Sequence, residues 1–178
     1  EAPAAELRSL ARAVEAWSRS RWTPEPPAPT GPLRLVAATG TVEGGGVGGL
    51  ELVVERREET PAVDLRHLVV RFVGPTLPGD DYAFFHPDRA VEETTDFGRF
   101  GVRVPGGSGP VLDSAGQRAV LRFDVGADTP EDGLAPVGEA LPAGAQFTVV
   151  LATREDGTAL QLAVPESPTG EQVSLEVE

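Results

Sequence analysis

Apolar and polar residues alternate with a period of two along most of the chain after residue 33. In the segment 119–125 every second residue is apolar, and Arg122 and Asp124 lie between the apolar positions. The segments 100–104 and 173–178 alternate in the same way. Such alternation is typical of antiparallel strands that bury one face. We expect strands at 33–38, 50–54, 65–73, 100–104, 119–125, 147–152, 158–164 and 173–177.

Turn-forming residues separate these segments. Pro, Gly and Asp occur together at 78–80, and Glu, Asp and Gly occur together at 155–157. Many short strands without helices between them favour packed β-sheets. The pattern therefore predicts an all-β fold, an antiparallel, Ig-like β-sandwich of about eight strands over residues 33–178. We also expect the last strand to bury Val173, Leu175 and Val177 and to hold the acidic residues between them outward.

The period changes near the beginning of the chain. Leu7, Leu10, Val14 and Trp17 recur every three or four residues, which predicts a helix over 6–22. Arg and Glu occupy its other faces, which favours packing of the apolar stripe against protein over a role at a membrane surface. Prolines recur between residues 23 and 32, and they predict an extended, semi-rigid linker. The predicted organisation is an N-terminal helix in 1–22, a linker in 23–32 and a β-domain in 33–178.

Composition and charge narrow the classes of partner. The 178 residues suit one domain, and the net charge of −13 repels nucleic acid and anionic lipid. No apolar run approaches the ~20 residues that span a bilayer, so we expect neither a nucleic-acid partner nor membrane contact by this fragment. The chain contains no cysteine, which excludes disulfides and thiolate ligands. Asparagine is also absent, which excludes the N-x-S/T glycosylation sequence.

Candidate catalytic and cofactor motifs are weak. The segment 44–49 (GGGVGG) contains G-x-G-x-x-G, but a strand-like run follows it, so a flexible hairpin is the better interpretation. We interpret His67, in the strand expected at 65–73, and His86, in a loop, as structural or surface histidines. Ser108 lacks the strand–turn–helix setting of a nucleophile. We therefore predict no catalytic residue, no cofactor and no enzymatic activity.

Acidic residues gather in two segments that contain Gly and Pro. The two clusters are Asp80, Asp81 and Asp88, and Asp124, Asp128, Glu131 and Asp132. Hard cations bind such oxygens, but the D-x-[DN]-x-[DN]-G spacing of an EF-hand loop is missing. Solvated loop carboxylates are the better interpretation, and we predict no metal site.

Four segments, in order along the chain, resemble the globular domain of archaellins, the subunits of the archaeal swimming filament. They are 40–75 (GTVEGGGVGGLELVVERREETPAVDLRHLVVRFVGP), 109–125 (GPVLDSAGQRAVLRFDV), 141–151 (LPAGAQFTVVL) and 164–178 (VPESPTGEQVSLEVE). The resemblance covers residues 33–178. It implies a structural protein without an active site, whose β-domain forms the outer sheath of a helical filament.

The resemblance also implies partners and location. Archaellins polymerise with their own copies or related archaellin subunits, through hydrophobic N-terminal helices bundled at the filament axis. We expect a structural subunit of an extracellular, cell-surface motility filament, an archaellum, which a rotary motor turns. That hydrophobic helix is absent from residues 1–178, and residues 6–22 would be a remnant of its lower end. The alternatives are a secreted or surface-anchored β-sandwich binding module and an accessory protein of the archaellum motor.

Overall fold

The computed structural model describes residues 31–74, 77, 81–86, 97–125, 140–153 and 157–177. These residues are all-β, apart from a single-turn 3-10 helix, η1 (Leu65–His67). The strands are β1 (Leu33–Glu43), β2 (Gly46–Arg56), β3 (Val63–Asp64), β4 (Val69–Val73), β5 (Asp81–Phe85), β6 (Phe97–Arg103), β7 (Val111–Leu112), β8 (Arg118–Asp124), β9 (Gln146–Ala152), β10 (Gly157–Ala163), β11 (Gln172–Ser174) and β12 (Glu176–Val177). The helix predicted in 1–22 lies outside the described residues, as do most of the linker and the turn at 78–80.

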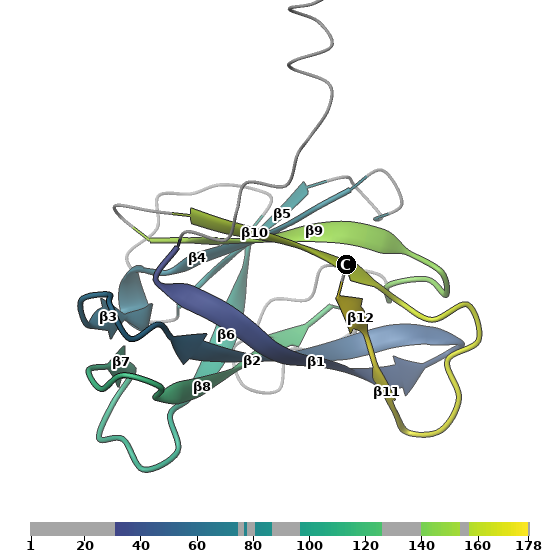
Figure 1. Ribbon diagram of the computed structural model, residues 1–178. Helices are drawn as coiled ribbons and strands as arrows, with labels where there is room; N and C mark the ends of the chain where they lie inside the picture. Colours follow the sequence, from purple (N-terminus) through teal and green to yellow (C-terminus); the bar gives the residue numbers. More distant parts are fainter. Residues whose placement is uncertain are drawn as a thin grey trace, which may run out of the picture.

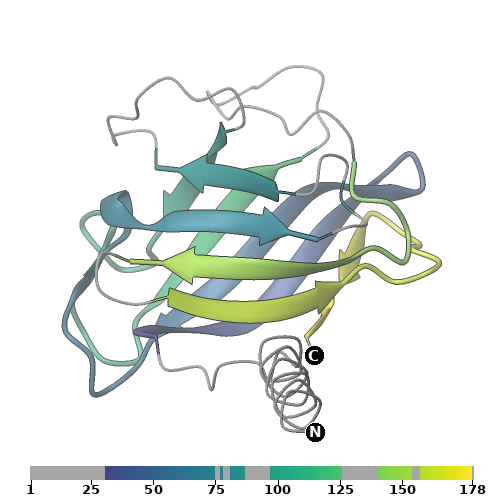
Figure 2. The same ribbon diagram turned by 90° about the horizontal axis from the view of Figure 1, so that it is seen from above.

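Within the described residues, ten strands form one continuous sheet in the order β11-β1-β2-β8-β6-β5-β4-β9-β10-β12. The sheet curls so that its two halves face each other (Figure 1). We call β11, β1, β2, β8 and β6 the β1 half, and β5, β4, β9, β10 and β12 the β9 half. Seen from above, the strands of the two halves cross at an angle (Figure 2). A separate small sheet pairs β3 with β7.

The predicted antiparallel Ig-like sandwich is wrong in its connectivity. The two layers are not separate sheets, because β5 and β6 pair along one side and make the layers continuous. This pair is parallel, with Ala83 opposite Phe97, whereas the other strand pairs of the described sheet are antiparallel. Alternation reveals which residues of a strand face inward, but it carries no information about which strand edges meet.

Phenylalanine rings fill the space between the halves. Phe72 on β4 lies with its ring centroid 4.8 Å from that of Phe84 on β5 and 5.1 Å from that of Phe123 on β8. Phe147 on β9 and Phe100 on β6 extend the cluster, at 5.5 Å from Phe72 and 5.6 Å from Phe123. All five side chains are buried. The inward positions of both halves therefore make one core.

The first hairpin confirms the interpretation of the glycine-rich segment. Gly44 and Gly45 join β1 to β2 with φ of 57° and 86°, so both lie in the left-handed region that a tight two-residue hairpin turn requires. A strand follows the turn, as expected. Gly46 is needed for a different reason, because a Cβ there would meet the carbonyl group of Leu141.

The C-terminal segment holds both ends of the curled sheet. β11 pairs with β1, and β12 pairs with β10, so residues 172–177 supply the outermost strand of each half. Between them Leu175 is 5% exposed, and its backbone N–H donates to the carbonyl oxygen of Ala38 at 3.0 Å. The expected pairing of this segment is confirmed. The expected burial is wrong for Val177, which is 52% exposed because the chain changes halves at Leu175.

Other differences concern strand boundaries. The strand predicted at 65–73 is η1 followed by β4, because the Asp64 side chain accepts from the Arg66 N–H and caps a helical turn. The short strands β3 and β7 and the strand β5 were not expected. β1 and β2 extend well beyond the predicted segments, to eleven residues each. In the part of the chain that the structure describes, no helix has the length and hydropathy needed to span a membrane.

Candidate functional site

The described residues do not gather into a recognisable metal site. Within them, no group of three His, Asp or Glu side chains lies close enough together to hold a metal ion. Of the two acidic clusters, only Asp124 has a described side chain, and it is half-buried at the end of β8. Asp80, Asp88, Asp128, Glu131 and Asp132 lie outside the described residues, so the prediction about these loops stays a prediction.

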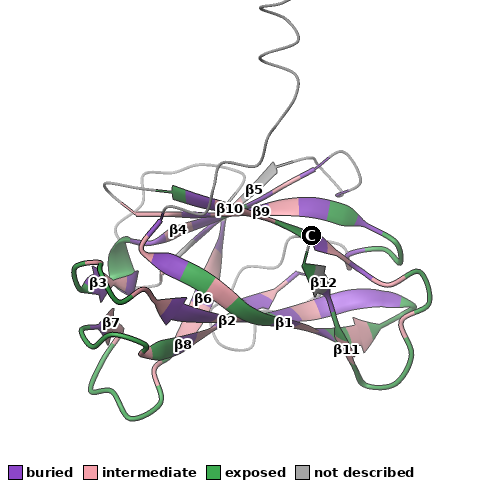
Figure 3. Cartoon of the chain, viewed as in Figure 1, coloured by how far each residue is buried: buried purple, intermediate pink, exposed green. Residues whose placement is uncertain are grey.

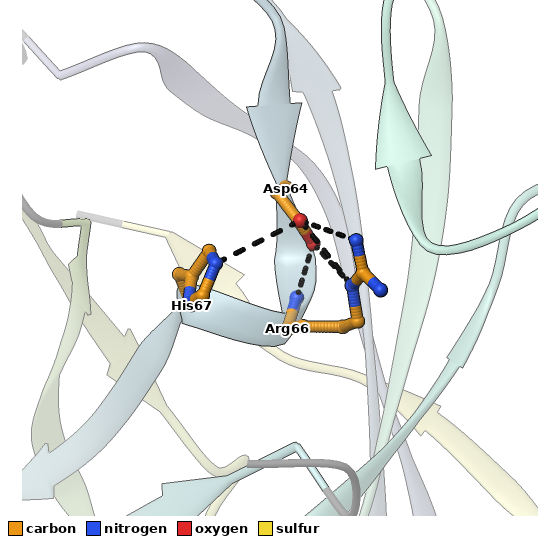
Figure 4. A network of polar contacts seen from close by, with 3 residues as sticks. All are labelled: Asp64, Arg66 and His67. Atoms are coloured by element: carbon orange, nitrogen blue, oxygen red, sulfur yellow. Dashed lines mark hydrogen bonds and ion pairs between the residues drawn. The ribbon is translucent and has the colours of Figure 1, made fainter.

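His67 lies in a small polar cluster rather than in a strand (Figure 4). Its Nε2 is 3.8 Å from Oδ2 of Asp64, which also accepts from Nη2 of Arg66 at 2.7 Å. The Arg66 hydrogen bonds are the main reason that the pKa of Asp64 lies below its ordinary value. His67 and Arg66 are both exposed. Because Asp64 also accepts from the backbone of η1, the arrangement is explained as a helix cap.

The other two singled-out residues follow the strands β5 and β6. His86 follows β5, and its ring packs edge-on against Phe100 with centroids 6.0 Å apart. Ser108 is exposed in the loop after β6. His67, His86 and Ser108 thus belong to three different segments, and His86 comes directly after Phe85, the register partner of Val69 on β4. The candidate functional sites that remain among the described residues are the outer surfaces of the sheet.

The point where the chain enters the β-domain is fixed by close contacts. Gly31 is buried, and a Cβ at this position would collide with the side-chain oxygen of Thr158 on β10. The carbonyl oxygen of Pro32 accepts from the N–H of Arg57 at 2.9 Å. The chain at residue 31 is therefore held beside the first residues of β10, at the edge of the β9 half.

A three-strand row of charges lies on the outer face of the β1 half, near the same end. Arg34 on β1, Glu55 on β2 and Arg118 on β8 are register partners. Nε of Arg118 donates to Oε2 of Glu55 at 2.8 Å, and Nη2 of Arg34 donates to Oε1. These hydrogen bonds, that of Arg118 first, lower the pKa of Glu55. Both arginines remain more than half exposed, so the row presents cationic groups to solvent.

The rest of this outer face is also charged. Its outward positions on β1, β2, β6 and β8 carry Arg34, Arg99, Arg103, Arg118, Arg122, Glu43, Glu51, Glu55 and Asp124. Apolar exceptions are Val36, which lies at a register shift in β1 and is 40% exposed, and a row of register partners that contains the exposed Ala37 and the half-buried Val53 and Val120. Charges of both signs make this half a well-solvated surface.

The outer face of the β9 half is different. We define the apolar face as the outward positions of β4, β9 and β10: Val69, Arg71, Val73, Gln146, Thr148, Val150, Ala152, Gly157, Ala159, Gln161 and Ala163. Arg71 is the only charged side chain among them. The valines and alanines are half-buried, and they alternate with buried positions along β9 (Figure 3). No labelled strand or helix lies over this face in Figure 1.

Sequence reasoning did not single out either surface. The signal was present in part, because 147–152 and 158–164 contain no charged residue while 119–125 contains two. What it lacked was the pairing of β4, β9 and β10, which places three neutral rows side by side.

Comparison with solved structures shows which known proteins share the fold of this chain. No protein-family model and no curated protein matches the chain. The crystal structure of the archaeal flagellin FlaB1 from Methanocaldococcus jannaschii aligns with a TM-score of 0.58 at 14% identity, covering 80% of this chain and 95% of that chain. The archaeal flagellum of Methanospirillum hungatei strain JF1 aligns with a TM-score of 0.49 at 15% identity, covering 97% and 87%. The likeness to FlaB1 shows that this chain has the fold of an archaeal flagellin, which is the resemblance that the four sequence segments predicted.

Proposed function

We propose that this chain is a structural subunit of an archaellum-like motility filament, with the β-domain exposed in the outer sheath. The observation that carries the proposal is the agreement of two independent lines. Four ordered sequence segments resemble archaellins, and the fold aligns with nearly the whole of the FlaB1 chain. Its partners are copies of itself or related archaellin subunits, and its location is an extracellular filament.

The way the chain enters the β-domain supports this role. Residues 31–33 are held by a hydrogen bond from the N–H of Arg57 to the carbonyl oxygen of Pro32 and by close packing of Gly31 against Thr158. A force applied to the preceding segment would therefore act on the end of β2 and on β10. A sheath domain tied to a filament axis by one connection needs such an anchor. Filaments arise when copies meet through heterologous contacts that do not close into a ring.

Labelling of surface filaments tests the proposal. An antibody raised against residues 31–178 should decorate filaments on cells that produce the protein, and mass spectrometry of sheared filaments should recover its peptides. Deletion of the gene should remove the filaments or their swimming function. Label confined to the cell envelope, with swimming unchanged after deletion, would favour the binding module instead. Label at the filament base alone would favour the motor accessory protein.

A further inference from the structure

We propose that the apolar face of β4, β9 and β10 is the docking surface for the N-terminal segment 6–22 of a second copy of this chain. The inference deepens the proposed filament role and rests on it for the expectation that copies meet. The half-buried valine and alanine side chains on three adjacent strands keep part of their apolar surface in water, and covering that surface with another apolar surface is favourable.

The segment 6–22 has the matching chemistry. Its stripe of Leu7, Leu10, Val14 and Trp17 is apolar, and the whole segment 1–22 carries four arginines and three glutamates, so it is nearly neutral. A nearly neutral occupant fits a face whose described outward positions carry Arg71 as their one charge. On the outer face of the β1 half, by contrast, the apolar row of Ala37, Val53 and Val120 lies between rows that contain charged side chains.

The dimensions also agree. As a helix, the stripe from Leu7 to Trp17 would extend about 15 Å at about 1.5 Å per residue. β9, with seven residues, offers about 24 Å at about 3.4 Å per residue. Three strands spaced about 4.8 Å apart present the width of one helix, about 10 Å. A helix on a sheet is a standard way of covering an apolar face.

The linker favours a second copy over the same chain. The segment leaves the domain at Gly31, beside Thr158 at the start of β10. Prolines at 24, 26, 27 and 29 favour an extended conformation, at about 3.1 Å per residue. Residues 23–30 would then span about 25 Å, comparable with the length of the face itself. A stiff linker of that length favours docking of the apolar stripe on the β-domain of a second copy over docking on its own domain. The contact between copies is then head-to-tail, and repeated contacts of this kind form an open filament when they do not close into a ring.

Disulfide trapping tests this assignment, because the chain contains no cysteine and each thiol is an introduced one. The 178-residue Leu10→Cys protein is mixed with the 178-residue Val150→Cys protein under mild oxidation. The matched control partner is Val120→Cys, since Val120 is also a half-buried outward valine in the interior of a strand, but on the charged half. Thermal melting first verifies that each variant folds. Val14→Cys with Ala159→Cys is a second pair, because Ala159 is the register partner of Val150.

The proposal expects mixed dimers to form about tenfold faster with Val150→Cys than with Val120→Cys, because docking raises the effective concentration of the two thiols. Equal rates with both partners, or no mixed dimer in either pair, would overturn it.

Faster formation of Val150→Cys homodimers than of mixed dimers would show that two apolar faces meet each other instead. A double variant that closes an internal disulfide would assign the face to its own chain. Filaments that contain the protein but show none of the expected cross-links would contradict the docking site and support the filament role. The expected cross-links in cells without such filaments would support the docking site and contradict the filament role.

Discussion

The β1 half and the β9 half contribute similar side chains to the shared core, but their outward positions differ. Arginine and acidic residues cover the β1 half, and some of them pair across strands, as Glu55 does with Arg34 and Arg118. Small apolar and uncharged side chains cover β4, β9 and β10. The inward residues of a strand therefore indicate that it packs in the core. The outward residues indicate what covers the surface, which is water for the β1 half and, as we propose, another protein segment for the β9 half.

The largest effect is expected from removing the segment that joins the two halves. Truncation after Gly170 deletes β11, β12 and the buried Leu175, and it uncovers the long edges of β1 and β10. Burial of one such leucine contributes about 1.5–3 kcal/mol, and unpaired edges promote aggregation. We expect the truncated protein to be largely unfolded or aggregated, as measured by circular dichroism and light scattering.

A matched pair of point variants sharpens this test. Leu175→Ala should cost about 2–5 kcal/mol of unfolding free energy because it removes a buried side chain and leaves a cavity beside Gly40. Val177→Ala should change little, since the side chain is half exposed. If both variants melt with the intact protein, the C-terminal segment does not hold the halves together.

The next effect concerns the ring cluster between the halves. Phe72→Ala removes a buried ring that contacts Phe84 and Phe147 in its own half and Phe123 in the other. Loss of a buried phenylalanine costs about 3–5 kcal/mol, whereas Phe72→Leu should cost clearly less because it keeps most of the apolar volume. Denaturant unfolding measures both. Separate transitions for the two halves in the alanine variant would contradict a single shared core.

A smaller effect is expected at the crossover from the β1 half to the β9 half. Asp64 caps η1, which leads directly into β4, and its side chain accepts from the backbone N–H of Arg66 at 3.0 Å. Asp64→Ala should lower the unfolding free energy by about 1 kcal/mol, and Asp64→Ser should restore part of the loss. Equal melting of the alanine and serine variants would mean that the cap does not stabilise the crossover.

The smallest effect is a pH dependence assigned to the β1 half. The hydrogen bonds from Arg118 and Arg34 hold the pKa of Glu55 below its ordinary value of 4.5. A lowered folded-state pKa means that Glu55 contributes stability above pH 4.5 and loses it as pH falls through the folded-state pKa. The Tm difference between the intact protein and Glu55→Gln should therefore be small at pH 7 and shrink further below pH 4.5.

Glu51→Gln, on the same outer face, is the control for this titration. A Tm difference for Glu55→Gln that grows toward low pH would contradict a lowered folded-state pKa. A difference shared equally by Glu51→Gln would mean that the charge of the face, and not the arginine pairs, is responsible.

The sequence predicted the strand-forming segments well where one face is buried against a core. The segment 119–125 coincides closely with β8, because its alternation is the direct consequence of a pleated strand with one wet face. The segment 147–152 also coincides closely with β9, although it is apolar at most of its outward positions as well. It also identified the hairpin at Gly44 and Gly45, since glycine, which has no Cβ, adopts the positive φ of such turns readily. The resemblance to archaellins, read from four segments, pointed to the fold that the FlaB1 comparison supports.

Long-range pairing was decided by the tertiary structure. Nothing local distinguishes β5 as the strand that joins two layers through a parallel pair with β6, because edge pairing depends on which segments the whole chain brings together. The same holds for Val177, which alternates as a buried residue would but becomes exposed when the chain changes halves at Leu175. The apolar face is likewise a product of pairing, since Val69, Val150 and Ala159 are distant in the sequence and become one surface only when β4, β9 and β10 lie side by side. Amino-acid order thus determined which residues turn inward along each strand, and the free energy of burying all strands in one core decided which outward residues became neighbours.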